Sequence, residues 1–276
     1  DSLGSRGLGD VYKRQPLNGE VPRMLPPVVR LTPPRASGVQ LLSSEVRAWN
    51  MEEVPLAQAS EVERFVTQKR RDEHLTGRWL LGQGLRAWGV DDLSVVEVVR
   101  NQRRAPSLAY IQGVWKRTPL PNISIAHSDG MAFVALVEPD RAVGFDAEPL
   151  GRQLAENAYD MMAKGAELDA LRSTPQHVFQ AWTGKEAVQK CLGHGMHLNP
   201  RNIQIPIGKE SATISIENSK IKLNYWHENG YHCSLAMRPA DVPVLTPEEV
   251  LLEATRSAME ADPDWGVGCK TTRSGS

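Results

Sequence analysis

Apolar residues recur at helical spacing in four parts of the chain. Residues 60–88 show the clearest repeat and predict a long helix, interrupted once, that Ser60 and Glu63 cap together and that Gly89 ends. Further helices are expected over residues 151–171, 175–192 and 247–260. The apolar positions of these helices predict faces that pack on a core.

Short runs rich in β-branched residues predict strands between the helices. They lie at residues 28–31, 93–100, 122–125, 131–137, 143–148, 203–207, 212–216, 220–226 and 231–237, with residues 39–49 as either a strand or a short helix. Two glycine turns, within residues 126–130 and 228–230, predict hairpins, and residues 100–106 form a basic turn. Most of the strands are therefore expected to pair antiparallel.

The order of elements, a long helix followed by strands that end in a hairpin, occurs twice. It predicts an α+β fold of two similar lobes related by a pseudo-twofold axis. Each lobe is a small, mostly antiparallel sheet packed with a long helix, and the active site lies at the lobe interface. We expect the lobes at residues 37–140 and 141–240 and a C-terminal helix with a disordered tail at 241–276. A chance similarity of two hairpins explains the pattern about equally well.

The N-terminal residues lack the sequence patterns expected of folded structure. Residues 1–15 resemble a translated sequencing adapter, and prolines crowd the next twenty residues. We therefore interpret residues 1–36 as an adapter-like artefact followed by a proline-rich, disordered lead-in.

Composition narrows the class of protein. The 276 residues carry a net charge of −1, so no general attraction to nucleic acid or to an anionic membrane is expected. Three cysteines are too few for a disulfide framework and favour a cytoplasmic protein. No apolar run is long enough to span a bilayer.

Two carboxylates stand out at the end of an apolar run. Asp146 and Glu148 alternate with Ala147, so in a strand their side chains share one face. Converging carboxylates suit a hard divalent cation such as Mg²⁺. Two solvated acids on an edge strand are the simpler interpretation of this pair alone.

The helix at 175–192 adds a second set of polar residues. Trp182, Glu186 and Lys190 are four residues apart and share one face. An exposed ion pair explains the two charges but not the tryptophan, which favours the wall of a cleft. If Glu186 reaches Asp146 and Glu148, three carboxylates surround a Mg²⁺ ion that can bind a pyrophosphate.

Basic residues of the first half supply candidate phosphate contacts. They lie on the long helix and in the basic turn, and His127 follows at a hairpin tip; the candidates are Arg64, Arg71, Arg100, Arg104 and His127. Solvated surface positions are the alternative for each of them.

Three motifs in order resemble the 4'-phosphopantetheinyl transferases. Gly144–Glu148 is similar to the family pattern Gly-x-Asp-x-Glu, and residues 182–190 are similar to Trp-(Ser/Thr)-x-Lys-Glu-(Ala/Ser)-x-x-Lys. Residues 122–128 resemble the Asn-Ile-Ser and Ser-His-Ser motif, with Ala126 in place of the first serine of the latter. Ala105 stands where the family's Gly-Lys-Pro turn has lysine. The resemblance covers residues 37–237 and indicates the larger, two-lobe monomeric type.

The resemblance implies a reaction. The enzyme would transfer 4'-phosphopantetheine from coenzyme A to a serine of an apo carrier protein, with Mg²⁺, and release 3',5'-ADP. Asp146, Glu148 and Glu186 would hold the metal, Glu186 would accept the serine proton, and Lys190 would neutralise or protonate the departing phosphate. His127, Ser128 and the basic groups of the first lobe would hold the adenosine 3'-phosphate.

Two other functions fit the same residues. The carboxylates suit a Mg²⁺-dependent phosphohydrolase that acts on a small phosphate ester, and the whole set suits an inert module that binds coenzyme A. The carrier, whether from fatty-acid, polyketide or peptide synthesis, is not specified by the sequence.

Overall fold

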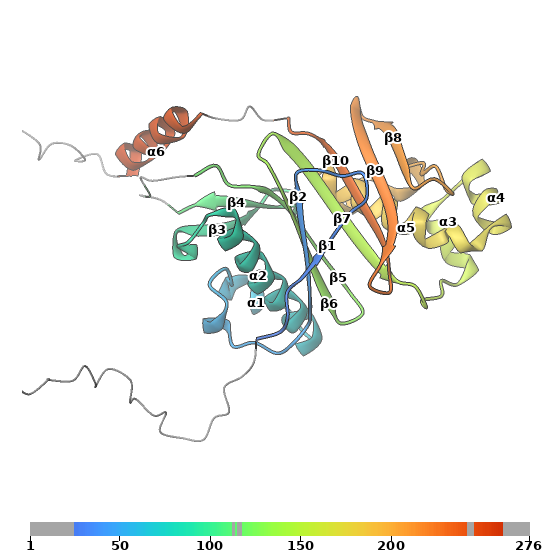
Figure 1. Cartoon of the computed structure of the whole chain (residues 1–276), viewed down its shortest axis with the longest axis horizontal. Coiled ribbons are helices and arrows are strands. Elements are labelled where there is room, and N and C mark those ends of the chain that lie inside the picture. The colour runs from blue at the N-terminus through green and yellow to red at the C-terminus, as the bar shows by residue number, and fades with distance from the viewer. Residues whose placement is uncertain (1–24, 112–113, 115–117, 242–245, 262–276) are drawn as a thin grey trace, which may run out of the picture.

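The computed structural model describes residues 25–111, 114, 118–241 and 246–261. The adapter-like segment 1–15 and the tail expected at 262–276 lie outside these residues. Two four-stranded antiparallel sheets, a two-stranded sheet and several helices make up the described part, so the expectation of an α+β protein is confirmed (Figure 1). Across this part of the chain, no helix has both the length and the apolar character needed to cross a membrane.

The first large sheet has the strand order β1-β2-β6-β5. Its strands are β1 (Val29–Leu31), β2 (Val39–Glu45), β5 (Asn122–Ser128) and β6 (Met131–Val137). The short helix α1 (Ala59–Val62) precedes α2 (Gln68–Trp88), and α2 packs on β2, β5 and β6. Leucines of α2 and alternate residues of β6, among them Val134 and Leu136, share one core.

The second large sheet has the strand order β7-β10-β9-β8. Its strands are β7 (Arg141–Pro149), β8 (Ser211–Ile216), β9 (Ser219–Glu228) and β10 (Tyr231–Pro239). The helices between β7 and β8 are α3 (Tyr159–Met162), α4 (Gly165–Ser173) and α5 (Val178–Cys191), and α5 packs on β7, β9 and β10. The last helix, α6 (Pro247–Ala261), follows the sheet.

The two large sheets meet through a shared apolar layer. Phe133 of β6, Phe145 of β7 and Leu235 of β10 belong to one buried cluster, with the two phenyl rings 5.5 Å apart. Because β7 turns Phe145 toward this layer, its neighbours Asp146 and Gly144 face α5 instead. The molecule is thus layered helix, sheet, sheet, helix, with α2 and α5 on the outside (Figure 1).

The two halves repeat the same connections. The strand orders β2-β6-β5 and β7-β10-β9 match, with the long helix following the first strand in each half. Each long helix also buries a cation paired with a carboxylate of the preceding helix: Arg78 with Glu61, and Lys185 with Glu167. These parallels support the pseudo-twofold arrangement, which stays a prediction.

Two expected helix starts are wrong. α1 begins at Ala59 after Gln58, whose side chain makes no cap, so Ser60 and Glu63 do not form the predicted box. The expected interruption falls at residues 63–67, where Thr67 caps α2 by accepting from the Arg70 amide. Residues 151–155 are also not helical.

The strand expected at residues 203–207 is absent from the described structure. Its alternating isoleucines do point inward, since Ile203 and Ile205 are buried. Side chains take the place of a neighbouring strand here: the Ile205 amide donates to Glu167 Oε1 over 2.9 Å, and Lys185 donates to the Ile203 carbonyl. The alternation of Ile203 and Ile205 therefore indicated that these side chains are buried, but not that the segment pairs with another strand.

The hairpin turns are tighter than expected. β5 continues through His127 to Ser128, so the turn holds Asp129 and Gly130 alone, both with positive φ. A two-residue turn with positive φ at both positions fits the twist of the flanking strands. The basic turn at 100–106 joins β3 (Val96–Arg100) to β4 (Pro106–Tyr110), a strand that the sequence pattern did not predict.

Candidate functional site

Gly144 lets α5 lie directly on β7. A Cβ atom at this position would come within 1.9 Å of the Ala187 carbonyl oxygen and 2.4 Å of the Cys191 amide nitrogen. These are backbone atoms, so no side-chain movement would relieve the clash. The glycine therefore sets the close approach that brings the polar face of α5 to Asp146.

Lys190 and Asp146 form the central contact of the site. The Lys190 ammonium donates to Asp146 Oδ1 over 2.7 Å and to the Phe145 carbonyl over 3.1 Å. Burial raises the pKa of Asp146 to about 6; the charges of Glu186 and Glu148 add to the rise, and Lys190 opposes it. The loss of hydration on burial therefore outweighs the stabilisation of the Asp146 carboxylate by the Lys190 ammonium.

Glu148 lies at the end of the same strand face. It accepts a hydrogen bond from Ser128 Oγ of β5 over 2.8 Å and forms an ion pair with Arg152. The predicted phosphate ligand Ser128 is thus bonded to a predicted metal ligand. This contact ties the end of the first sheet to the carboxylate strand.

The three predicted metal ligands are near neighbours but not a closed metal site. Glu186 lies on α5 near enough to raise the pKa of Asp146. Among the residues that the structure describes, however, no group of three or more His, Cys, Asp or Glu side chains is placed to hold a metal ion. Lys190 and Arg152 neutralise two of the carboxylates in this arrangement. The donor set, three carboxylates in a partly buried place, nevertheless suits a hard cation such as Mg²⁺.

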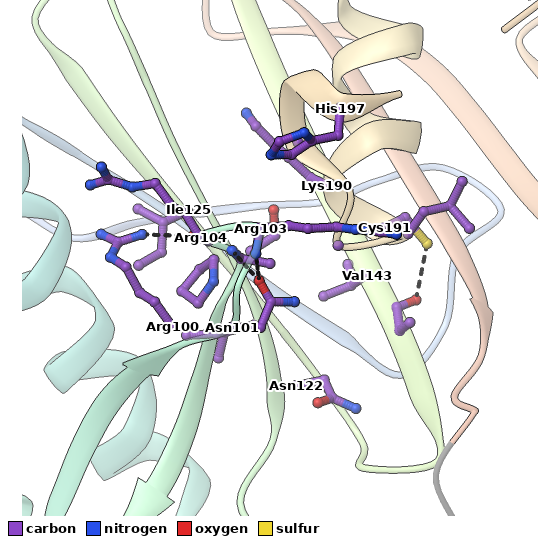
Figure 2. A pocket seen from close by; sticks show the side chains of 18 of the residues that line it. Arg100, Asn101, Arg103, Arg104, Asn122, Ile125, Val143, Lys190, Cys191 and His197 are labelled. Atoms are coloured by element: carbon purple, nitrogen blue, oxygen red, sulfur yellow. Dashed lines mark hydrogen bonds between the residues drawn. The ribbon is translucent and has the colours of Figure 1, made fainter. Parts of the chain in front are cut away.

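A cleft of about 780 Å³ opens beside this cluster. Arginines of the β3–β4 turn line one side, and Lys190 and Cys191 at the end of α5, with His197 of the segment that follows it, line the other (Figure 2). The volume is within the range of small-molecule sites. The walls come from both halves of the chain, and Lys190 is the residue that lies both in the cleft and on Asp146.

A buried arginine forms part of the cleft floor. Arg78 is 2% exposed and donates to Glu61 Oε2 over 2.9 Å, while its Nε and Nη1 have no hydrogen-bond partner within the described residues. Burial works to raise the pKa of Glu61, but hydrogen bonds from Arg100 and Arg78 lower it to about 2. A buried guanidinium with unused donors is suited to bind an anion.

His127 faces the same cleft from β5. Its Nε2 has no hydrogen-bond partner in the described part of the chain, and a side chain at Gly77 would come within 2.6 Å of it. Burial lowers the pKa of His127 to about 3, with the positive charges of Lys190 and Arg70 adding to the effect. The imidazole is therefore neutral near pH 7, and it is a cleft residue rather than a solvated turn residue.

Only some of the predicted phosphate ligands line the cleft. Arg100, Arg104, His127 and Lys190 line it, whereas Arg64 and Arg71 do not, and Arg71 borders a separate hollow beside Trp49. Four further arginines line the cleft: Arg70 and Arg78 of α2, Arg103 of the basic turn, and Arg238 of β10. Arg70, His74 and Arg78 are four residues apart on α2 and therefore share one face of the helix. This spacing is the sequence signal that indicates Arg70 and Arg78 as cleft residues.

Buried polar contacts fix the helix that carries Glu186 and Lys190. Lys185 donates to Glu167 Oε2 over 2.7 Å, and Thr183 Oγ1 lies 2.8 Å from Ser234 Oγ of β10. Trp182, Glu186 and Lys190 are half-buried, whereas the other residues of α5 are buried. Their shared face matches the expectation from their spacing.

The second half of the chain matches a known protein family. Residues 142–236 match the family model of the 4'-phosphopantetheinyl transferase superfamily. The matched segment runs from β7 to β10 and contains Asp146, Glu148, Glu186 and Lys190. No curated protein matches the chain significantly.

Proposed function

Because residues 142–236 carry a domain of the 4'-phosphopantetheinyl transferase superfamily, we propose that this chain transfers 4'-phosphopantetheine from coenzyme A to a serine of an apo carrier protein. Mg²⁺ assists the reaction, and 3',5'-ADP is released. One observation carries the proposal: Lys190 joins the carboxylate strand to a cleft rich in arginine. Phosphoryl transfer needs this combination of anion binding and charge neutralisation in one place.

The arginines of the cleft bind the phosphates of coenzyme A. Arg78 offers two unused donors from the cleft floor, and Arg100, Arg103 and Arg104 surround the opening. His127, neutral near pH 7, donates a hydrogen bond to an oxygen of the adenosine 3'-phosphate. Guanidinium groups suit this role because they bond phosphate oxygens in pairs.

Asp146, Glu148 and Glu186 would hold Mg²⁺. When bound, the ion neutralises charge on the pyrophosphate. Lys190 and Arg152 occupy two of these carboxylates, so each must turn away as the substrate enters. Lys190 then lies where its ammonium can neutralise the departing phosphate.

Glu186 accepts the proton of the carrier serine. It is half-buried, it lies one helical turn from Lys190 on the same face, and its charge acts on Asp146. The serine oxygen attacks the phosphorus nearer the pantetheine, the bond from that phosphorus to the ADP portion breaks, and 3',5'-ADP departs. Positioning and charge neutralisation supply most of the acceleration.

A carrier-loading assay tests the proposal. The chain is incubated with coenzyme A, Mg²⁺ and a panel of apo carriers from fatty-acid, polyketide and peptide synthesis, and each carrier is weighed by mass spectrometry. A gain of one phosphopantetheinyl group is expected on at least one carrier and not on its serine-to-alanine variant. Release of phosphate from small esters without carrier loading would favour a phosphohydrolase instead.

A further inference from the structure

A second polar cluster lies on the hairpin formed by β9 and β10. His227 and His232 are directly opposite each other in the strand register, and Tyr225 stands two residues before His227 on the same face. Tyr225 Oη lies 2.7 Å from His227 Nε2 and 2.6 Å from His232 Nδ1. The two imidazole nitrogens are 3.1 Å apart.

The separation of the two nitrogens suits a chelated metal ion. With metal–nitrogen bonds of about 2.0–2.1 Å, nitrogens 3.1 Å apart subtend roughly 100° at the metal, close to a tetrahedral angle. Imidazole nitrogens prefer Zn²⁺, Cu²⁺ and Ni²⁺ over the hard cation Mg²⁺. This donor set therefore differs in kind from the carboxylates around Asp146.

The surroundings hold one histidine and leave the other accessible. His232 is 8% exposed and stacks on Phe179 of α5, with ring centroids 5.3 Å apart. His227 is exposed and gives an entry path for an ion from solvent. Packing that fixes the orientation of one ligand, with solvent access at the other, is compatible with metal binding.

We propose that His227 and His232, with Tyr225 as the third donor, form a binding site for a divalent transition-metal ion such as Zn²⁺. The cluster is a row across one face of the sheet, since His232 is also the register partner of Glu148 on β7. The site uses none of the proposed Mg²⁺ ligands, although His232 lies directly across from Glu148, and it does not depend on the transferase function.

Metal titration of the full chain tests the site. Tag-free protein is titrated with Zn²⁺ by calorimetry in excess Mg²⁺, which occupies carboxylate sites. Wild type is expected to bind one equivalent, and His227→Asn to bind at least tenfold more weakly. His194→Asn is the matched control because it removes an imidazole of the same half, paired with Glu217, outside the cluster; it should bind as wild type does.

A spectroscopic measurement covers the case in which a variant misfolds. In wild type, imidazole NMR signals of His227 and His232 should both shift at one equivalent of Zn²⁺, while the signal of His194 stays in place. Unchanged Zn²⁺ affinity in folded His227→Asn, or shifts confined to other histidines, would overturn the proposal.

Discussion

The ammonium of Lys190 lies 2.7 Å from Asp146 Oδ1, although the two residues are 44 positions apart in the chain. The contact joins α5 to β7 and connects the arginine-rich cleft with the carboxylate strand. Replacement of Lys190 by alanine should lower kcat about a hundredfold and leave KM for the carrier nearly unchanged, because the ammonium acts on charge that develops during transfer. Steady-state kinetics with a loaded carrier as product measures both constants.

Lys220→Ala is the matched control, because Lys220 is an exposed lysine on β9. Its kinetic constants should equal those of wild type. A large rise in KM for Lys190→Ala at unchanged kcat would argue against the assigned role.

Gly144→Ala should destabilise the fold by about 3 kcal/mol or more, because the new methyl group meets backbone atoms of α5 at Ala187 and Cys191. Chemical denaturation measures the free energy of unfolding. Gly151→Ala makes a suitable comparison, since an added Cβ there has no described atom within 4 Å, and its stability should change little. Equal stability of the two variants would contradict the close packing of α5 on β7.

Glu61→Gln should lower the free energy of unfolding by about 3 kcal/mol, because Arg78 is buried and would lose its charged partner. The variant should also unfold at a lower denaturant concentration with an unchanged slope. Glu63→Gln, an exposed change two residues away, should have an effect within about 0.5 kcal/mol. A Glu61 variant as stable as wild type would mean that the buried guanidinium needs no carboxylate.

Acid should weaken the fold through His74 and His127. Burial lowers the pKa of His74 to about 4 and that of His127 to about 3, both below the ordinary value of 6.5. As pH falls below 6.5, the two histidines become protonated in the unfolded chain but stay neutral in the folded protein. The free energy of unfolding therefore decreases. Denaturation from about pH 7 to about pH 5 should show this decrease, and His127→Gln should show a smaller one. An identical decrease in the variant would show that titratable groups other than His127 cause the loss of stability in acid.

Local spacing in the sequence predicts which candidate site residues share a face. It does not predict which other residues they contact. The shared face of Asp146 and Glu148 follows from strand alternation, and that of Glu186 and Lys190 from helix spacing. Tertiary packing decided the rest: the residues that neutralise these carboxylates, the exclusion of Arg64 from the cleft lining, and the burial of Arg78. Apart from the Arg152–Glu148 ion pair, whose members are four residues apart, these features depend on residues distant in the sequence.

The same limit explains the misplaced elements. Ile203 and Ile205 alternate as in a strand, but Glu167 and Lys185 bond their backbone groups in place of a neighbouring strand. β4 pairs with β3 although Pro106 begins it, because a strand tolerates proline at its first residue. The two hairpins, set by Asp129-Gly130 and Asn229-Gly230, were predictable because turn chemistry is local.

The most direct test of the central claim is the mass of an apo carrier after incubation with coenzyme A, Mg²⁺ and either wild type or Asp146→Ala. Wild type should add one phosphopantetheinyl group to the carrier serine. Asp146→Ala should fold normally, which circular dichroism checks, and leave the carrier at its original mass. Loading at near wild-type rates by Asp146→Ala, or no loading of any carrier by wild type, would contradict the account.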